Sequence, residues 1–208
     1  MADTVASPAS GESFPSGYFE AMYARETDPW GFATSAYERE KYAATIAALP
    51  RSRYHAAFEI GCSVGVLTEM LAPRCDALLA TDCAASVLDT ARARCAGYPQ
   101  VQFAAMQVPE DWPEGGLDLI VLSEVGYYLS LNDLGTLRAR IAAHLVPGGH
   151  LLLVHWTPRI NECVLTGDDV HALFQEWEGT RFGHRVGERA ATYRLDLWER
   201  LPDVTVTR

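Results

Sequence analysis

The sequence predicts an α/β fold with a doubly wound, mostly parallel sheet, because short apolar segments alternate with longer helical ones along most of the chain. Five apolar runs have the length and composition of buried strands. They cover residues 56–60, 77–81, 101–105, 117–122 and 150–154. A sixth segment, residues 193–198, alternates apolar and polar side chains and predicts an antiparallel strand at the sheet edge.

Segments with apolar residues at helical spacing separate these strands. In the first of them Tyr42, Ile46 and Leu49 lie on one face, and Pro50 ends the pattern. The predicted helices cover residues 37–49, 65–72, 86–94, 132–145 and 168–177. Helices placed between parallel strands make right-handed crossovers, so we expect them to cover both faces of the sheet.

Length and composition limit the number of domains. A chain of 208 residues with 49% apolar side chains can bury one sizeable core but is short for two. We therefore expect residues 17–208 to form a single domain, in which residues 17–50 form an N-terminal helical lid. Residues 1–16 are rich in Ala, Ser, Pro and Gly, so they are predicted to be a disordered tail and not a secretory signal.

Charge and cysteine content narrow the possible partners. The net charge of −10 would repel a phosphate backbone, so no nucleic acid partner is expected. No apolar segment approaches the roughly 18 residues needed to cross a bilayer, so no membrane partner is expected either. The five cysteines form no C-x-x-C pair and are expected to be free thiols. These features favour a cytoplasmic protein with a small-molecule partner and leave the oligomeric state open.

The most informative local feature is the turn from the first predicted strand into the next helix, Glu59-Ile60-Gly61-Cys62-Ser63-Val64-Gly65. Its two glycines allow a ligand to approach the backbone, although they also suit a plain strand-to-helix turn. Asp82 ends the next strand, where a carboxylate can accept hydrogen bonds from both hydroxyl groups of an adenosine ribose. NAD-binding proteins share that acidic residue, but their G-x-G-x-x-G pattern needs glycine where this chain has Ser63.

Taken in order along the chain, these features resemble the class I S-adenosylmethionine-dependent methyltransferases. The resemblance rests on the E-x-G-x-x-x-G turn, on Asp82, on the strand at 117–122 that leads into Ser123-Glu124-Val125, and on Leu-Val-Pro-Gly-Gly-His at 145–150. It covers about residues 56–155. It implies a Rossmann-like sheet of seven strands, S-adenosyl-L-methionine as the cofactor, and an enzyme that transfers the cofactor's methyl group.

A more specific resemblance is to the nodulation protein S family, N-methyltransferases that act on the free amine of a chitooligosaccharide. The segments that look alike lie at 28–30, 37–40, 59–62, 71–73 and 124–129. The likeness implies N-methylation of a small-molecule amine, carried by an amino sugar or a sugar-containing metabolite. The chain departs from the family pattern at residues 155–159 and 165–170, which motivates O-methylation of a small hydroxylated or carboxylated metabolite as an alternative. A third hypothesis is a noncatalytic binding module that keeps the cofactor fold.

The resemblance also assigns residues to the cofactor. Gly61 and Cys62 would line its methionine part, Asp82 would hold its ribose, and Met106 and Gln107 would flank its adenine. The full set of expected cofactor-binding residues is Trp30, Arg39, Glu59, Gly61, Cys62, Gly65, Asp82, Cys83, Met106, Gln107 and Ser123.

Three residues are candidates for the chemistry of methyl transfer. Glu124 follows the fourth strand at the carboxyl edge of the sheet, where it either orients a substrate amine and accepts its proton or serves as a simple cap. His155 ends the fifth strand and is either a base or a satisfied structural histidine. Tyr128 either touches the substrate or forms a pocket wall. The sequence contains no convincing carboxylate or histidine cluster for a metal, and methyl transfer needs none.

An aromatic group precedes the first strand, and it forms either a simple packing cluster or a lid. It consists of Tyr18, Phe19, Tyr23, Trp30, Phe32 and Tyr37. In the lid interpretation Trp30 covers the cofactor, Arg39 pairs with its carboxylate, and aromatic faces attract the sulfonium by cation–π interaction.

Overall fold

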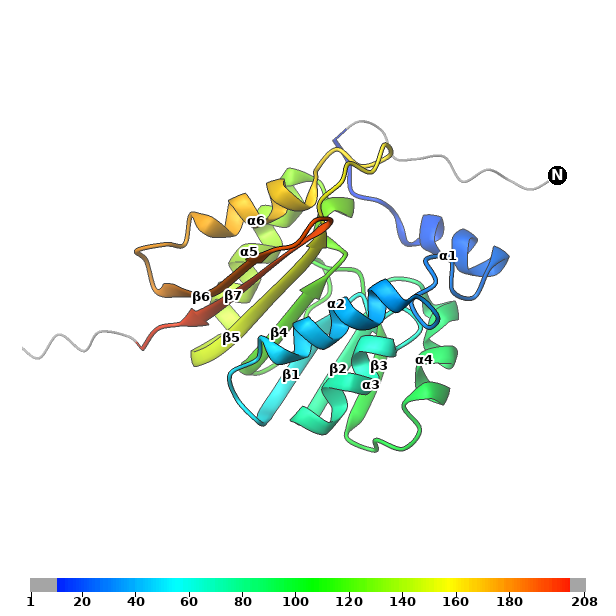
Figure 1. Cartoon of the computed structure of the whole chain (residues 1–208), viewed down its shortest axis with the longest axis horizontal. Helices are drawn as coiled ribbons and strands as arrows, with labels where there is room; N and C mark the ends of the chain where they lie inside the picture. The colour runs from blue at the N-terminus through cyan, green and yellow to red at the C-terminus, as the bar shows by residue number, and fades with distance from the viewer. Residues whose placement is uncertain (1–10, 203–208) are drawn as a thin grey trace, which may run out of the picture.

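The computed structural model describes residues 11–202, which form a seven-stranded sheet with helices on both faces (Figure 1). The strand order is β3-β2-β1-β4-β5-β7-β6. The strands are β1 Tyr54–Ile60, β2 Cys75–Asp82, β3 Val101–Ala105, β4 Leu117–Ser123, β5 Leu145–Trp156, β6 Phe182–Arg189 and β7 Tyr193–Arg200. Strands β1 to β5 pair in parallel, and β7 is antiparallel to both β5 and β6. The predicted fold class is therefore confirmed.

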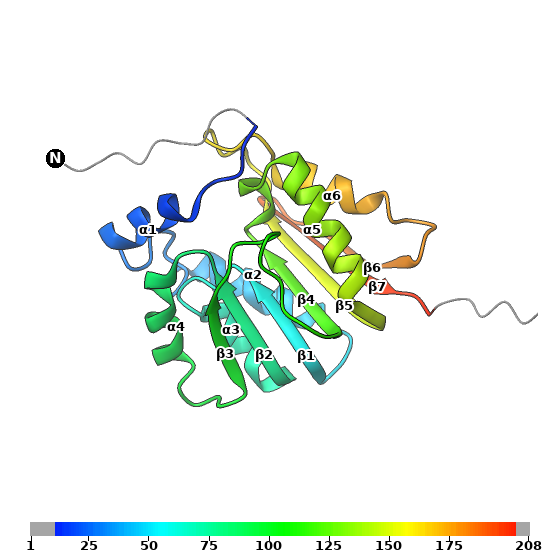
Figure 2. The same ribbon diagram turned by 180° about the vertical axis from the view of Figure 1, so that it is seen from behind.

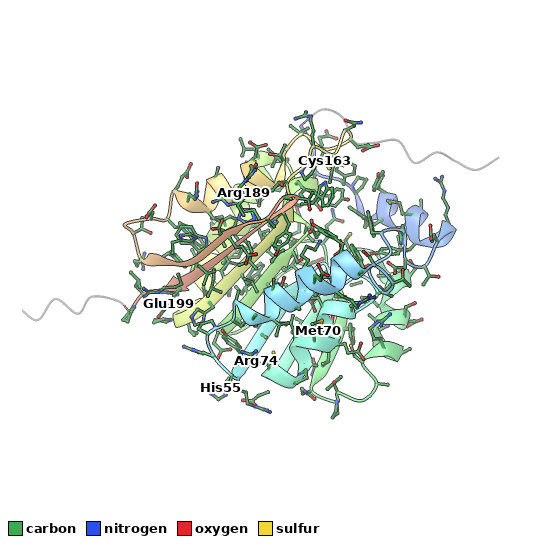
Figure 3. All side chains as sticks on the ribbon, in the orientation of Figure 1. His55, Met70, Arg74, Cys163, Arg189 and Glu199 are labelled. Carbon is green, nitrogen blue, oxygen red and sulfur yellow. The ribbon has the colours of Figure 1, made fainter. Side chains whose placement is uncertain are left out.

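The position of β7 differs in one respect from the expectation. The predicted strand 193–198 is antiparallel as expected, but it lies one place in from the edge because β6 pairs with its outer side. Within β6 only Phe182 is buried, so the strand lacks the apolar run that marks the others. Arg189, labelled in Figure 3, lies at the end of β6. Its Nη2 atom donates to Oδ2 of Asp168 at 2.8 Å.

The helices divide between the two faces of the sheet, as the two opposite views show (Figure 2). The α-helices are α1 Ser16–Arg25, α2 Ala36–Ala47, α3 Val66–Leu71, α4 Leu88–Arg94, α5 Leu131–His144 and α6 Gly167–Gln175. Short 3-10 helices are η1 Ala72–Arg74, η2 Ala85–Val87 and η3 Gly126–Tyr128. Each face of the sheet packs against helices and forms an apolar core, and the buried strand β4 contributes to both. Leu119 and Val121 pack with residues of α2 and α3, whereas Ile120 and Leu122 pack with residues of α5 and α6.

The N-terminal segment differs from the predicted tail, which covered residues 1–16. Residues 1–10 of that prediction lie outside the described part of the chain. Phe14 is buried, and its N–H donates to the Tyr128 carbonyl oxygen at 2.9 Å. The physical reason is that this aromatic side chain packs edge-on against Tyr18 and Tyr128, which outweighs the flexible composition around it.

Candidate active site

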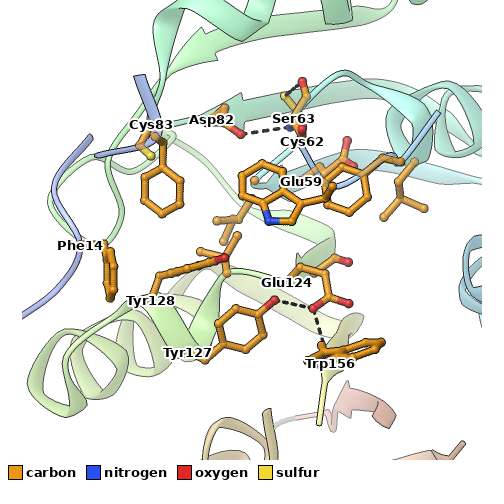
Figure 4. A pocket seen from close by; sticks show the side chains of 18 of the residues that line it. Phe14, Glu59, Cys62, Ser63, Asp82, Cys83, Glu124, Tyr127, Tyr128 and Trp156 are labelled. Carbon is orange, nitrogen blue, oxygen red and sulfur yellow. Dashed lines mark hydrogen bonds between the residues drawn. The ribbon is translucent and has the colours of Figure 1, made fainter. Parts of the chain in front are cut away.

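A cavity of about 520 Å³ opens at the carboxyl ends of β1, β2 and β4, between the sheet and the N-terminal segment (Figure 4). Parallel strands of an open α/β sheet place ligand sites at this edge. Aromatic and acidic side chains dominate the lining. The aromatic members are Phe14, Phe19, Tyr23, Trp30, Phe32, Tyr37, Tyr42, Tyr127, Tyr128 and Trp156, and the charged members are Glu38, Lys41, Glu59, Asp82 and Glu124.

The glycine turn after β1 forms the floor of the cavity. Gly61 has a φ of +81°, and a Cβ atom there would lie 2.2 Å from Cγ2 of Val125. Glycine is therefore required both by the left-handed backbone and by the close approach of the loop after β4. The N–H groups of Gly61 and Cys62 both donate to the Thr81 carbonyl oxygen at 2.8 Å.

Asp82 ends β2 and is 7% exposed beside this turn. Its two oxygens accept hydrogen bonds of 3.0 Å from the backbone N–H groups of Ser63 and Ala84. Burial raises the pKa of Asp82 above its ordinary value, and the two backbone donors oppose that rise. The carboxylate is held rigidly at the cavity wall, with lone pairs left to accept further hydrogen bonds.

Glu59 lies deeper, at 1% exposure. The Thr68 hydroxyl donates to its Oε2 atom at 2.7 Å. Burial raises the pKa of Glu59 to about 7, and the hydrogen bond from Thr68 limits the rise. A buried carboxyl that titrates near neutrality and borders a cavity is typical of a ligand-binding site.

Glu124 lies among the labelled lining residues in Figure 4, and both of its carboxylate oxygens accept hydrogen bonds. Its φ of +58° is in the left-handed region, which is strained for a residue with a side chain. Its Oε1 atom lies 2.6 Å from Nζ of Lys41. Its Oε2 atom accepts from the Tyr127 hydroxyl at 2.6 Å and from the Trp156 N–H at 2.8 Å.

Lys41 is a site residue that the sequence reasoning missed. Its side chain is 2% exposed, and its Nζ atom lies within 3 Å of carboxylate oxygens of both Glu38 and Glu124. Burial alone would lower the pKa of Lys41, but these carboxylates more than offset burial and raise it, so the ammonium is charged. The signal in the sequence was the spacing of Glu38, Lys41, Tyr42 and Thr45, which is that of the buried face of a helix.

Arg39 and Gly65 are not among the residues that line the cavity, in contrast to the prediction. Arg39 lies on the exposed face of α2, and its guanidinium donates to the Thr34 carbonyl oxygen at 3.1 Å. Gly65 begins α3 with a φ of +80°, and a Cβ atom there would meet the backbone of Ala91 at 3.0 Å. Its role is close packing between two helices.

His155 does not line the cavity, in contrast to the expectation for a base, and its surroundings fit the alternative of a satisfied structural histidine. It is fully buried behind the loop that follows β4, and its Nε2 atom accepts the Gly126 N–H at 3.1 Å. Burial, His171 and Lys41 together hold the pKa of His155 well below its ordinary value. The His155 side chain points toward α6, where its ring contacts His171. It is therefore buried although the residue lies at the strand end that borders the cavity.

The other predicted site residues border the cavity. They are Trp30, Glu59, Gly61, Cys62, Asp82, Cys83, Met106, Gln107, Ser123, Glu124 and Tyr128. Trp30 stacks on Phe32 with ring centroids 5.5 Å apart and meets Tyr23 edge-on at 5.7 Å. The Tyr23 hydroxyl donates to Ser63 at 2.8 Å, which ties this aromatic group to the glycine turn.

Comparison with known proteins agrees with this geometry. The sequence profile of the nodulation protein S family matches residues 22–172. The chain belongs to the nodulation protein S family. It is 33% identical over 129 residues to nodulation protein S of Rhizobium tropici, an alignment that covers 60% of this chain and 53% of the relative. It is 35% identical over 103 residues to nodulation protein S of Bradyrhizobium diazoefficiens, with 49% of each chain covered. The chain thus spans about half the length of these curated relatives.

Solved structures of nodulation protein S and of a second protein share the fold. The N-methyltransferase NodS from Bradyrhizobium japonicum WM9, in complex with S-adenosyl-L-homocysteine, superposes with a TM-score of 0.75 and 25% identity over 85% of this chain and 95% of that one. A protein of Pseudomonas syringae described as a methyltransferase has 40% identity and a TM-score of 0.69 over 80% of this chain and 100% of that one. These matches confirm the predicted family and show that the chain has the fold of a solved N-methyltransferase, with S-adenosyl-L-methionine as the family's cofactor.

Two further observations concern the residues that the structure describes. No helix in residues 11–202 is long and apolar enough to cross a membrane. Within the same range, no group of three or more His, Cys, Asp and Glu side chains is arranged to hold a metal ion.

Proposed function

We propose that this nodulation protein S relative transfers the methyl group of S-adenosyl-L-methionine to the nitrogen of a small-molecule amine, carried by an amino sugar or a sugar-containing metabolite. The observation that supports this most strongly is the charge of the cavity. Among residues 11–202, four carboxyl groups line it against a single basic side chain, Lys41. An excess of negative charge in a partly desolvated site favours cationic ligands, and both the sulfonium cofactor and a protonated amine are cationic.

The residues present fit the cofactor along the length of the cavity. Asp82 would accept hydrogen bonds from the ribose hydroxyls, since its carboxylate is already fixed by two backbone donors. Glu59 would pair with the ammonium group. Lys41 would pair with the carboxylate in place of the exposed Arg39. Met106 and Gln107 would border the adenine.

Methyl transfer requires alignment and exclusion of water more than acid–base chemistry. When bound, S-adenosyl-L-methionine supplies an electrophilic methyl group on a sulfonium. Trp30, Phe32 and Tyr128 supply aromatic walls that would keep water out and favour positive charge by cation–π attraction. Glu124 would orient the amine nitrogen through its carboxylate, whose position is fixed by Lys41, Tyr127 and the Trp156 N–H.

An amine is favoured over a hydroxyl because Glu124, the group proposed to hold the acceptor, is not a free base. Among the described residues that line the cavity none is a histidine, and both oxygens of Glu124 already accept strong hydrogen bonds. An acceptor that arrives as the ammonium first gives its proton to solvent, and the neutral amine then attacks with its own lone pair, whereas a sugar hydroxyl needs proton removal as it attacks. The O-methylation alternative was motivated by the segment that starts at His155. The His155 side chain lies outside the cavity, and the residues of this segment that line it, Trp156 and Ile160, carry no base.

The test is a matched pair of acceptors that differ in a single group. D-glucosamine and D-glucose are incubated with the protein and S-adenosyl-L-methionine, and the product is analysed by mass spectrometry. We expect methylation on nitrogen with the amine and none with the hydroxyl sugar. Equal turnover of the two, or a methyl group on oxygen, would contradict N-methylation. Cofactor binding without turnover of any amine would favour the binding module.

The proposal also covers the organisation and setting of the protein. The described part of the predicted domain 17–208 is a single domain, residues 17–50 close over the cavity, and the protein is cytoplasmic and acts without a metal.

A further inference from the structure

Behind the cavity, a buried chain of hydrogen bonds runs from the loop after β4 to β7. The Gly126 N–H donates to Nε2 of His155 at 3.1 Å, and Nδ1 of His155 lies 3.1 Å from Nε2 of His171. Nδ1 of His171 lies 2.5 Å from Oδ2 of Asp196. Both histidines are fully buried, and Asp196 is 1% exposed. None of these three side chains lines the cavity, so the proposed chemistry does not use them directly.

The donors and acceptors fix the proton positions along this chain. A backbone N–H can only donate, so Nε2 of His155 must be unprotonated and Nδ1 must carry the proton. That proton is donated to Nε2 of His171, which leaves the His171 proton on Nδ1, where Asp196 accepts it. Burial lowers the pKa of His171 although Asp196 opposes it, and the pKa of His155 is also lowered, so both rings are neutral. Asp196 is held in turn by His184 and Arg194.

The series of hydrogen bonds begins at Gly126, in the same loop that carries Glu124. Three consecutive residues of β5 hold it: the Val154 carbonyl oxygen accepts the Glu124 N–H at 2.9 Å, His155 accepts the Gly126 N–H, and the Trp156 N–H donates to the Glu124 side chain. A Cβ atom at Gly126 would lie 2.9 Å from Nε2 of His155, so only glycine lets the loop close onto the ring. The strained φ of +58° at Glu124 persists only if its surroundings hold it.

We propose that His155 is a positioning residue that fixes Glu124 through the Gly126 N–H, and that His171 and Asp196 select the tautomer of His155 that can do so. The inference rests on the proposed function only in assigning Glu124 a role toward the amine. The tautomers and the position of the loop are properties of the protein without ligands.

The first test is NMR of the full chain labelled with ¹⁵N-histidine. We expect His155 and His171 both to carry their proton on Nδ1, with each resonance assigned by its loss in the corresponding His→Asn variant. A proton on Nε2 of His155 in the native protein would overturn the proposal. In Asp196→Leu the acceptor of the His171 Nδ1 proton is lost, so His171 can hold its proton on Nε2 and donate it to Nδ1 of His155, and we expect His155 to shift toward the Nε2–H form. An unchanged His155 tautomer in that variant would overturn the role of Asp196.

The second test compares two amide side chains at the same position. In His155→Gln the longer side chain can offer its Oε1 to the Gly126 N–H, whereas in His155→Asn the shorter one cannot reach it. We expect the Gly126 amide to exchange with solvent at least about tenfold faster in His155→Asn than in the native protein, because its buried acceptor is lost. The ¹³C resonance of the Glu124 carboxyl, assigned with Glu124→Gln, should move in His155→Asn and stay near its native position in His155→Gln.

Equal exchange rates and an unmoved Glu124 resonance in His155→Asn would contradict the positioning role. Binding of S-adenosylhomocysteine by each variant reports that it is folded. If the native protein fails to bind that ligand, the result counts against the proposed function. The NMR measurement of the two histidine tautomers would still test the positioning role of His155. The two failures are therefore distinguishable.

Discussion

Lys41 and Glu124 form a buried ion pair with 2.6 Å between Nζ and Oε1, although 83 residues separate them in the sequence. One partner lies on α2 of the N-terminal segment and the other follows β4, so the pair joins the N-terminal segment to the sheet at the cavity wall. Glu38 contacts the same ammonium and adds a second carboxylate. Glu124 is therefore not a free carboxylate but part of a cluster of three charged groups with Lys41 and Glu38.

Lys41→Met is expected to weaken both the fold and cofactor binding, because it leaves two buried carboxylates without their cation. Breaking a buried ion pair from one side typically costs about 3 to 5 kcal/mol in free energy of unfolding. The dissociation constant for S-adenosylhomocysteine should rise at least about tenfold through loss of a charge-assisted contact. Arg39→Met, two positions away on the exposed face of α2, is the matched control and should change neither quantity. Similar losses in both variants, measured by denaturant unfolding and calorimetry, would contradict the assignment of Lys41.

Cofactor affinity should depend on pH through Glu59. Its pKa is raised to about 7 by burial, so below that pH the carboxyl is neutral and cannot pair with the ammonium of the ligand. Affinity for S-adenosylhomocysteine should therefore increase as pH rises toward 7, by up to about tenfold per pH unit, and then level off. Calorimetric titrations between about pH 5.5 and about pH 7.5 measure this.

Two variants separate Glu59 from other titrating groups. Glu59→Gln should bind more weakly with a flat pH profile. Thr68→Val removes the hydroxyl that donates to Glu59, so the pKa of Glu59 should rise and the midpoint of the profile should move to higher pH. A profile of native shape in Glu59→Gln would rule out this residue as the source.

The same substitution at two glycines should have opposite effects. Gly61→Ala places a methyl group 2.2 Å from Val125 on a backbone with positive φ, so it should lower the melting temperature and abolish binding of S-adenosylhomocysteine. Gly135→Ala lies inside α5 with nothing within 4 Å of the added Cβ, so it should stabilise the protein by about 1 kcal/mol through helix propensity. If Gly61→Ala binds S-adenosylhomocysteine with native affinity, the glycine turn does not contact the cofactor.

The sequence predicted the parallel part of the sheet well because buried parallel strands are continuous apolar runs, as in β4, where every residue is buried. Strand β6 was missed because its side chains are mostly exposed and its pairing with β7 is made by the backbone. Phe14 was assigned to a tail because local composition carries no information about a distant partner such as Tyr128.

Among site residues, those in the turns after β1 and β2 were predicted because a motif fixes both their identity and their place. Arg39 and Lys41 carry the same charge and lie two positions apart on α2. Which of them faces the cavity depends on which face of the helix is buried, and residue charge gives no information about that. His155 lies at the correct strand end, but its side chain faces α6, and the direction of a side chain at a strand end depends on register that the sequence alone does not give.

The measurement that tests the central claim most directly is calorimetric titration of the purified protein with S-adenosylhomocysteine and, in parallel, with NAD. We expect tight binding of S-adenosylhomocysteine alone, weakened at least about tenfold in Asp82→Asn, which loses one of the acceptor oxygens and the charge that would hold the ribose. Binding of NAD with none of S-adenosylhomocysteine, or full affinity in the folded Asp82→Asn variant, would contradict the account of this site.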